Sequence, residues 1–93
     1  MKSFLPIGSV VLLKDSSKRV MIVGLKQHQV DSDKVWDYSG CLFPEGVVDP
    51  EQLYLFDRDQ IARLYFIGLQ DSESLSFLRR ISELEQQNGE GNH

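Results

Sequence analysis

The sequence contains few of the residues that most often bind metals or carry out nucleophilic catalysis. It has one cysteine, Cys41, and two histidines, His28 and His93, in 93 residues. A single cysteine excludes an intramolecular disulfide and a cysteine zinc cluster. The two histidines are too far apart in sequence to have the paired spacing of a zinc site. We therefore expect no catalytic residues, no metal and no cofactor, and we interpret Cys41 as a buried structural thiol.

Positive charge is also scarce. The chain has 10 Lys and Arg against 14 Asp and Glu, and its net charge is −4. Residues 51–93 contain four arginines and eight acidic residues, so the whole negative excess lies in the second half. Proteins that bind nucleic acid usually present a basic stripe to the phosphate backbone. We therefore expect no binding to nucleic acid.

No apolar run approaches the roughly 20 residues that a membrane-spanning helix needs. The N-terminal segment 1–8 has one lysine and a short apolar stretch interrupted by Pro6, which does not form the core of a signal peptide. A single cysteine also fits a reducing compartment. These features predict a cytoplasmic protein without membrane contact.

Aromatic residues, in contrast, are concentrated between Val35 and Leu69. Large rings bury the most apolar area per residue, so we expect the core to include this segment. The rings have three candidate roles: core packing, a protein-binding patch, or stacking on bases, and the lack of basic charge disfavours the last. Five of them are our candidate partner-binding residues: Trp36, Tyr38, Tyr54, Phe56 and Tyr65.

Short, β-branched apolar segments bounded by turn residues predict five strands. The polar loop 15–18 between the first two predicts an antiparallel hairpin. The last segment is apolar at nearly every position, which favours a central place in the sheet with both faces covered. The predicted strands span residues 9–14, 19–25, 35–43, 53–56 and 63–69.

The sequence after the last strand predicts one helix over residues 72–87, capped by Asp71-Ser72 and ended by Asn88-Gly89. Its apolar side chains occupy one half of the helical wheel, and we expect that half to cover a face of the sheet. These side chains are Leu75, Phe77, Leu78, Ile81 and Leu84.

The elements together predict the α+β class. We expect one domain over residues 1–87, made of a small curved antiparallel sheet or half-barrel of about five strands with one C-terminal helix. The sheet would occupy residues 8–69 and the helix residues 72–87. The polar residues 88–93 are predicted to form a disordered tail.

Several blocks of the sequence, taken together, resemble a known family. They are LPIGSVVLLK at 5–14, RVMIVG at 19–24, DYSGCLFPEG at 37–46, then Phe56 and IARLYFIG at 61–68. In combination they resemble a family of small proteins with an uncharacterised domain. Genes of that family lie in type VII secretion loci of Gram-positive bacteria, beside LXG-domain toxins. The resemblance spans about residues 5–69.

The resemblance implies a non-enzymatic cytoplasmic chaperone or targeting factor that binds an LXG toxin, or its accessory proteins, before secretion. It supplies no catalytic motif and no known binding residue. An immunity protein that neutralises a toxin domain is the alternative, and homo-oligomer formation stays open. The chain also lacks the Trp-X-Gly export signal of this pathway, because Asp37 and Tyr38 follow Trp36. This favours a protein that remains inside the cell.

Overall fold

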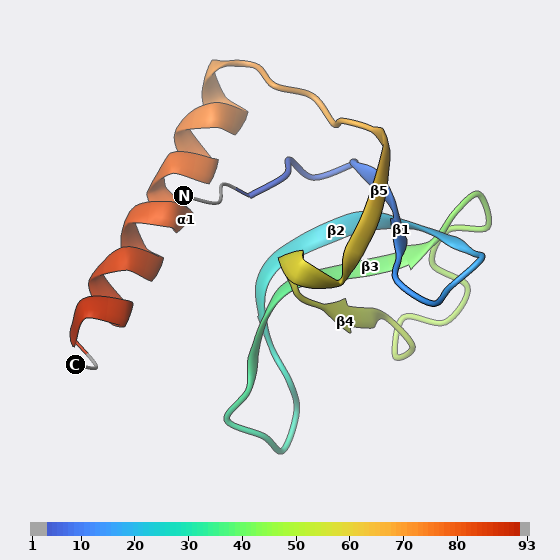
Figure 1. Ribbon diagram of the computed structural model, residues 1–93, viewed down its shortest axis with the longest axis horizontal. Coiled ribbons are helices and arrows are strands. Elements are labelled where there is room, and N and C mark those ends of the chain that lie inside the picture. Colours follow the sequence, from blue (N-terminus) through green and yellow to red (C-terminus); the bar gives the residue numbers. More distant parts are fainter. Residues whose placement is uncertain (1–3, 92–93) are drawn as a thin grey trace.

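The protein folds into a five-stranded antiparallel open sheet with one C-terminal helix, which confirms the predicted α+β class (Figure 1). The computed structural model describes residues 4–91. The strand order is β4-β3-β2-β1-β5. The elements are β1 (Val10–Leu13), β2 (Arg19–His28), β3 (Val35–Leu42), β4 (Tyr54–Phe56), the 3₁₀ turn η1 (Arg58–Gln60), β5 (Ile61–Phe66) and α1 (Ser72–Gly91).

The hairpin of β2 and β3 is the longest pairing in the sheet, and it bends at a register shift between Ile22 and Gly24. A second glycine, Gly40 on β3, lets neighbouring elements approach the strand closely. A Cβ at this position would collide with Val20 Cγ1 and would lie 3.1 Å from the Phe56 ring. The missing side chain therefore makes room for Phe56 to pack across the sheet.

The core is built around two fully buried rings, Tyr38 on β3 and Phe56 on β4, whose centroids are 5.4 Å apart. The Tyr38 ring also packs edge-on against Phe4, at 5.8 Å. Its hydroxyl oxygen accepts a 2.8 Å hydrogen bond from the Leu5 N–H. Burial raises the pKa of Tyr38 more than this hydrogen bond lowers it, so the phenol stays protonated at neutral pH. The N-terminal segment is thus fixed to the middle of the sheet.

The prediction that the last strand lies centrally is wrong. β5 is an edge strand that pairs only with β1, and five of its six residues are exposed. The pairing slips twice, and β5 contributes one extra residue at each slip. Apolar residues on both faces of a strand indicate two covered faces only if other elements lie over them. Here α1 covers neither face of β5, so the pattern marks exposed apolar surface instead.

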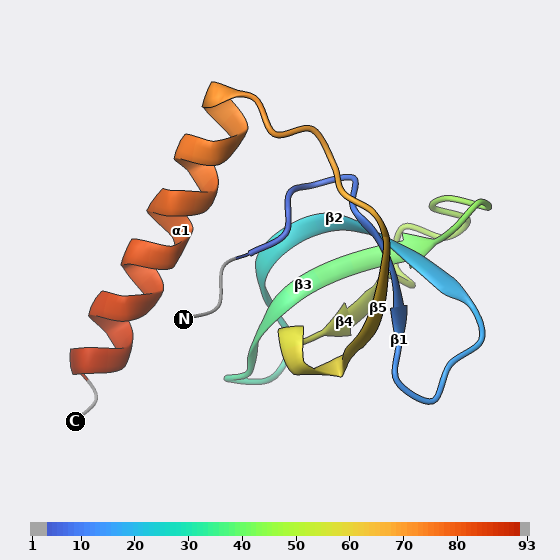
Figure 2. The same cartoon turned by 45° about the horizontal axis from the view of Figure 1, so that its top comes forward.

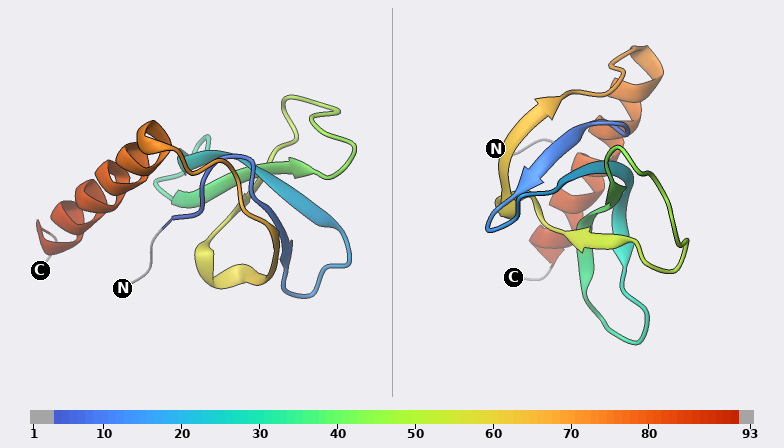
Figure 3. Two further views of the ribbon diagram at one scale, coloured as in Figure 1. Left: turned by 90° about the horizontal axis from the view of Figure 1, so that it is seen from above. Right: turned by 90° about the vertical axis from the view of Figure 1, so that its right-hand side faces the viewer.

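The helix also does not cover a face of the sheet as predicted. Figures 2 and 3 show α1 beside the sheet, on the side where the N-terminal segment runs. Leu78 joins the core cluster and Ile81 packs against it, whereas Leu75, Phe77 and Leu84 remain exposed. The N-terminal segment contributes Phe4 to the same core cluster, where its ring packs against Tyr38.

The helix is longer than predicted, since it continues through Asn88 and Gly89 to Gly91. A disordered tail from residue 88 is therefore wrong for residues 88–91, and residues 92–93 of that tail lie outside the described chain. Glycine lowers helix stability by about 1 kcal/mol relative to alanine, but it still donates its backbone N–H. A single glycine therefore does not have to end a helix.

Candidate protein-binding surface

Two of the five candidate partner-binding residues are in the core. The side chains of Tyr38 and Phe56 are fully buried, so their placement on a binding surface is wrong. Alternation along a strand identifies which side chains share a face, but it does not show whether that face meets solvent or other side chains. Their burial depends on Phe4 and on the β3–β4 pairing, both of which are long-range contacts.

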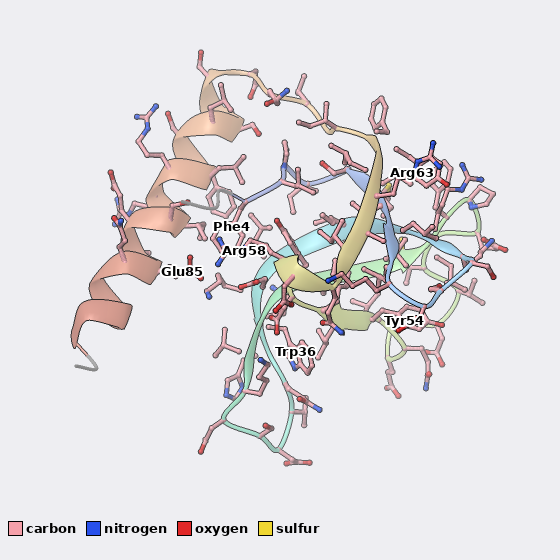
Figure 4. All side chains as sticks on the ribbon, in the orientation of Figure 1. Phe4, Trp36, Tyr54, Arg58, Arg63 and Glu85 are labelled. Atoms are coloured by element: carbon pink, nitrogen blue, oxygen red, sulfur yellow. The ribbon has the colours of Figure 1, made fainter. Side chains whose placement is uncertain are left out.

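The other three candidates reach the surface at separate places, as Figure 4 shows for Trp36 and Tyr54. The half-buried Trp36 donates its indole N–H to Gln29 Oε1 at 2.9 Å, and Lys34 Nζ lies 4.6 Å from its ring centroid. Tyr54 borders an apolar pocket of about 230 Å³ beside the loop between β3 and β4. Tyr65 is exposed on β5. The structure therefore does not unite the predicted residues in one patch.

A network of four charged side chains connects the helix to the sheet. Arg58 contacts Asp37 on β3 at 3.2 Å and Glu85 on α1 at 2.9 Å. Lys26 on β2 contacts the same two carboxylates, at 3.7 Å and 3.1 Å. The Arg58 guanidinium also stacks over Phe4, 4.4 Å from the ring centroid, and Figure 4 shows Phe4, Arg58 and Glu85 between helix and sheet. The network holds the C-terminal half of α1 in place.

The charges in this network balance, so it does not form an attractive site for a charged ligand. Partial burial by itself lowers the pKa of Arg58, but the nearby carboxylates of Asp37 and Glu85 outweigh burial and raise it above its usual value. Each of the two cations, Arg58 and Lys26, thus pairs with both carboxylates. We interpret the network as structural.

Asp57, at the start of η1, should make stability depend on pH. Burial raises its pKa, but hydrogen bonds from the Asp37 N–H (3.0 Å) and Lys34 Nζ (3.1 Å) outweigh burial and lower the pKa below its usual value. A carboxyl with a depressed folded pKa stabilises the fold above its unfolded pKa, and this is lost as pH falls through the folded pKa. Asp57→Asn should therefore cost about 1 kcal/mol at pH 7, and the deficit should vanish toward pH 2.

Urea denaturation of both proteins across this pH range measures the effect. Asp59→Asn, a change at the exposed residue two positions along, is the matched control and should not alter stability. A deficit of Asp57→Asn that is the same at pH 7 and pH 2 would show that the charge of Asp57 does not stabilise the fold.

Apolar side chains are exposed where the N-terminal segment, the linker between β5 and α1, and the first half of α1 meet. Each of them is between 40% and 73% exposed. Figure 2 shows these three segments enclosing one region of the molecule. We call this region the junction surface, and its residues are Ile7, Ile67, Leu69, Leu75 and Phe77.

Two grooves hollow the junction surface. One, of about 460 Å³, runs between α1 and the N-terminal segment, with Leu5, Ile67 and Leu75 among its lining residues. The other, of about 480 Å³, is lined by Ile7, Leu69 and Phe77 together with the acidic residues Asp71 and Glu73. Apolar surface gathered in grooves with a polar rim is typical of protein contacts, unlike single exposed apolar residues.

The family model described as "Domain of unknown function (DUF4176)" matches residues 4–77. The chain belongs to this family. Comparison of the chain with curated proteins and with solved structures found no match. The matched range runs from the core residue Phe4 to Phe77 on α1, so it includes the whole junction surface. The part of α1 after Phe77, which includes Glu85, lies beyond the DUF4176 match.

The described part of this DUF4176 protein contains no cluster of three or more His, Cys, Asp or Glu side chains placed to hold a metal ion. Cys41 is buried, in agreement with its interpretation as a structural thiol. Within the same residues, no helix is long and apolar enough to span a membrane. His93 lies outside the described residues.

Sequence patterns did indicate four of the five residues of the junction surface, all except Ile7, but with the wrong role. Ile67 and Leu69 belong to the segment predicted as a central strand, and Leu75 and Phe77 to the helix stripe predicted to cover the sheet. Their apolar character was therefore visible. Neither pattern shows that both segments remain uncovered in the folded protein.

Proposed function

We propose that this DUF4176 protein is a non-enzymatic binding protein that docks a polypeptide partner on its junction surface. The observation that supports this role is the gathering of five exposed apolar side chains on three converging segments, where they line two grooves. Burying such surface against a partner contributes about 25 cal/mol per Å² of apolar area removed from water.

The resemblance to proteins encoded beside LXG toxins suggests the partner. We propose a cytoplasmic chaperone or targeting role, in which the protein binds an LXG toxin before type VII secretion. A polypeptide awaiting export exposes apolar segments that favour aggregation, and a grooved apolar surface can cover such segments. On export, the toxin would leave this protein and make its apolar contacts with the secretion machinery instead.

Co-purification with an LXG toxin tests the proposal. Leu69→Asp and Phe77→Asp should each reduce the retained toxin at least tenfold, because each places a charge in the buried interface. Both side chains are at least half exposed, so the melting temperature should change little. Val30→Asp, at an 81% exposed position in the β2–β3 loop, is the matched control and should retain the toxin.

Undiminished retention by both junction variants would contradict docking at this surface. Failure of the wild-type protein to retain an LXG toxin would contradict the function itself. Toxicity assays distinguish the alternative: an immunity protein protects cells from the isolated toxin domain, whereas a chaperone raises export without such protection.

A further inference from the structure

Two arginines lie against one exposed tyrosine on the sheet. Arg19 of β2 and Arg63 of β5 are placed with their guanidinium carbons 5.6 Å and 4.9 Å from the centroid of the Tyr65 ring. Arg19 also lies 5.2 Å from the ring centroid of Phe43. The register aligns the two arginines in one row across the sheet, because Leu12 of β1 pairs with both.

Neither arginine makes an ion pair within the described side chains, although Lys18, Lys26, Lys34 and Arg58 all do. One carboxylate, Glu45, is close enough to Arg19 for its pKa to be affected. That carboxylate is already engaged, since a 2.7 Å hydrogen bond from Lys18 is the main cause of its lowered pKa. This edge of a negatively charged protein therefore has an excess of positive charge.

Stacking on Tyr65 prepares the two arginines for a ligand. A guanidinium that lies over a ring keeps the N–H groups at its edge available, and these match the two oxygens of a carboxylate. Cation–π contact also restricts the side chain before binding, which lowers the entropy that the ligand would have to offset. The row across β2, β1 and β5 places the backbones of the two arginines two strands apart, on the order of 10 Å. Both guanidiniums lie against the Tyr65 ring, and because each can bind one carboxylate, the pair can bind two.

We propose that Arg19, Tyr65 and Arg63 form a binding site for an acidic polypeptide segment with at least two carboxylates. A nucleic acid fits this site less well. The protein's net charge is −4, and the Tyr65 ring is occupied by guanidinium groups instead of being open for a base. The site stands on its own contacts and does not depend on the junction surface.

A fluorescein-labelled peptide of alternating Glu and Ser, titrated with the full chain at about 50 mM salt, is the probe. We expect the wild-type protein to bind it, and a peptide with Gln in place of Glu to bind at least tenfold more weakly. Arg19→Gln and Arg63→Gln should each weaken binding of the Glu peptide about tenfold. Arg80→Gln, which removes an exposed arginine of α1, is the matched control and should not change it.

Tyr65→Leu tests whether the contact of the arginines with the ring contributes to binding beyond their positive charge. The leucine keeps an apolar side chain at this position but removes the ring. It should weaken binding of the Glu peptide several-fold with little change in melting temperature.

Equal affinity for the Glu and Gln peptides, or equal losses of affinity in Arg63→Gln and Arg80→Gln, would overturn the proposal. Tighter binding of a single-stranded oligonucleotide, or full displacement by millimolar phosphate, would also overturn it. Leu69→Asp should leave this binding intact, so failure here is distinguishable from failure of toxin docking.

Discussion

Tyr38→Ala is expected to remove about half of the protein's free energy of unfolding, whereas Tyr54→Ala should change it little. Removing a buried aromatic ring costs about 3–5 kcal/mol, and a domain of this size has about 5–10 kcal/mol of stability in total. Tyr38 packs against both Phe4 and Phe56, so its loss leaves a cavity between the sheet and the N-terminal segment. Tyr54 is 47% exposed, so its truncation leaves no comparable cavity.

Tyr38→Phe separates the ring from its hydroxyl group. It keeps the packing but leaves the Leu5 N–H without its 2.8 Å acceptor, so it should cost about 1–2 kcal/mol. Circular dichroism during urea denaturation measures all three variants. A cooperative Tyr38→Ala transition within 1 kcal/mol of wild type would mean that this ring does not hold the core together, contrary to its complete burial.

Gly68→Ala is expected to destabilise the protein by about 2–3 kcal/mol, through collision with backbone and not with a movable side chain. A Cβ at residue 68 would overlap the Ile7 carbonyl oxygen and would lie 3.2 Å from the Ser9 nitrogen. The two segments are also joined by hydrogen bonds. The Gly68 N–H donates to Ser9 Oγ at 3.0 Å, and this hydroxyl donates to the Pro6 carbonyl at 2.8 Å. Separating the segments would break this connection and distort the junction surface.

The matched control for Gly68→Ala is Gly46→Ala. Gly46 has a φ of +84°, but a Cβ there would have no atom within 4 Å, so only backbone strain of about 1 kcal/mol opposes the change. Denaturant midpoints of the two variants give the comparison. A Gly68→Ala variant no less stable than Gly46→Ala would show that the N-terminal segment does not pack against the linker as described.

The elements of the fold were predictable because each depends on neighbours in sequence. The hairpin of β1 and β2 follows from two β-branched segments around a four-residue polar loop. The start of α1 at Ser72 follows from the capping residue Asp71, whose carboxylate accepts a hydrogen bond from the Ser74 N–H at 2.8 Å. The C-terminal end was less predictable, because glycine disfavours a helix without blocking it.

The candidate site was less predictable, because surface and core residues share one composition. Tyr38 and Trp36 are two residues apart on β3, yet the first is fully buried and the second is not. Arg19 and Arg63 come together only because β5 pairs with β1, a connection across more than 40 residues that no local pattern reports. The same long-range pairing carries Leu69 and Phe77 to the segment that contains Ile7.

The sequence by itself determined the α+β class, the approximate positions of the strands and the start of the helix, since hydrogen bonding and side-chain periodicity within short segments decide these. Only the tertiary structure decided that β5 lies at an edge, that Phe4 packs against Tyr38, and which apolar side chains remain exposed. Burial results from competition among distant segments for the same core volume, and its outcome is a property of the packed chain as a whole.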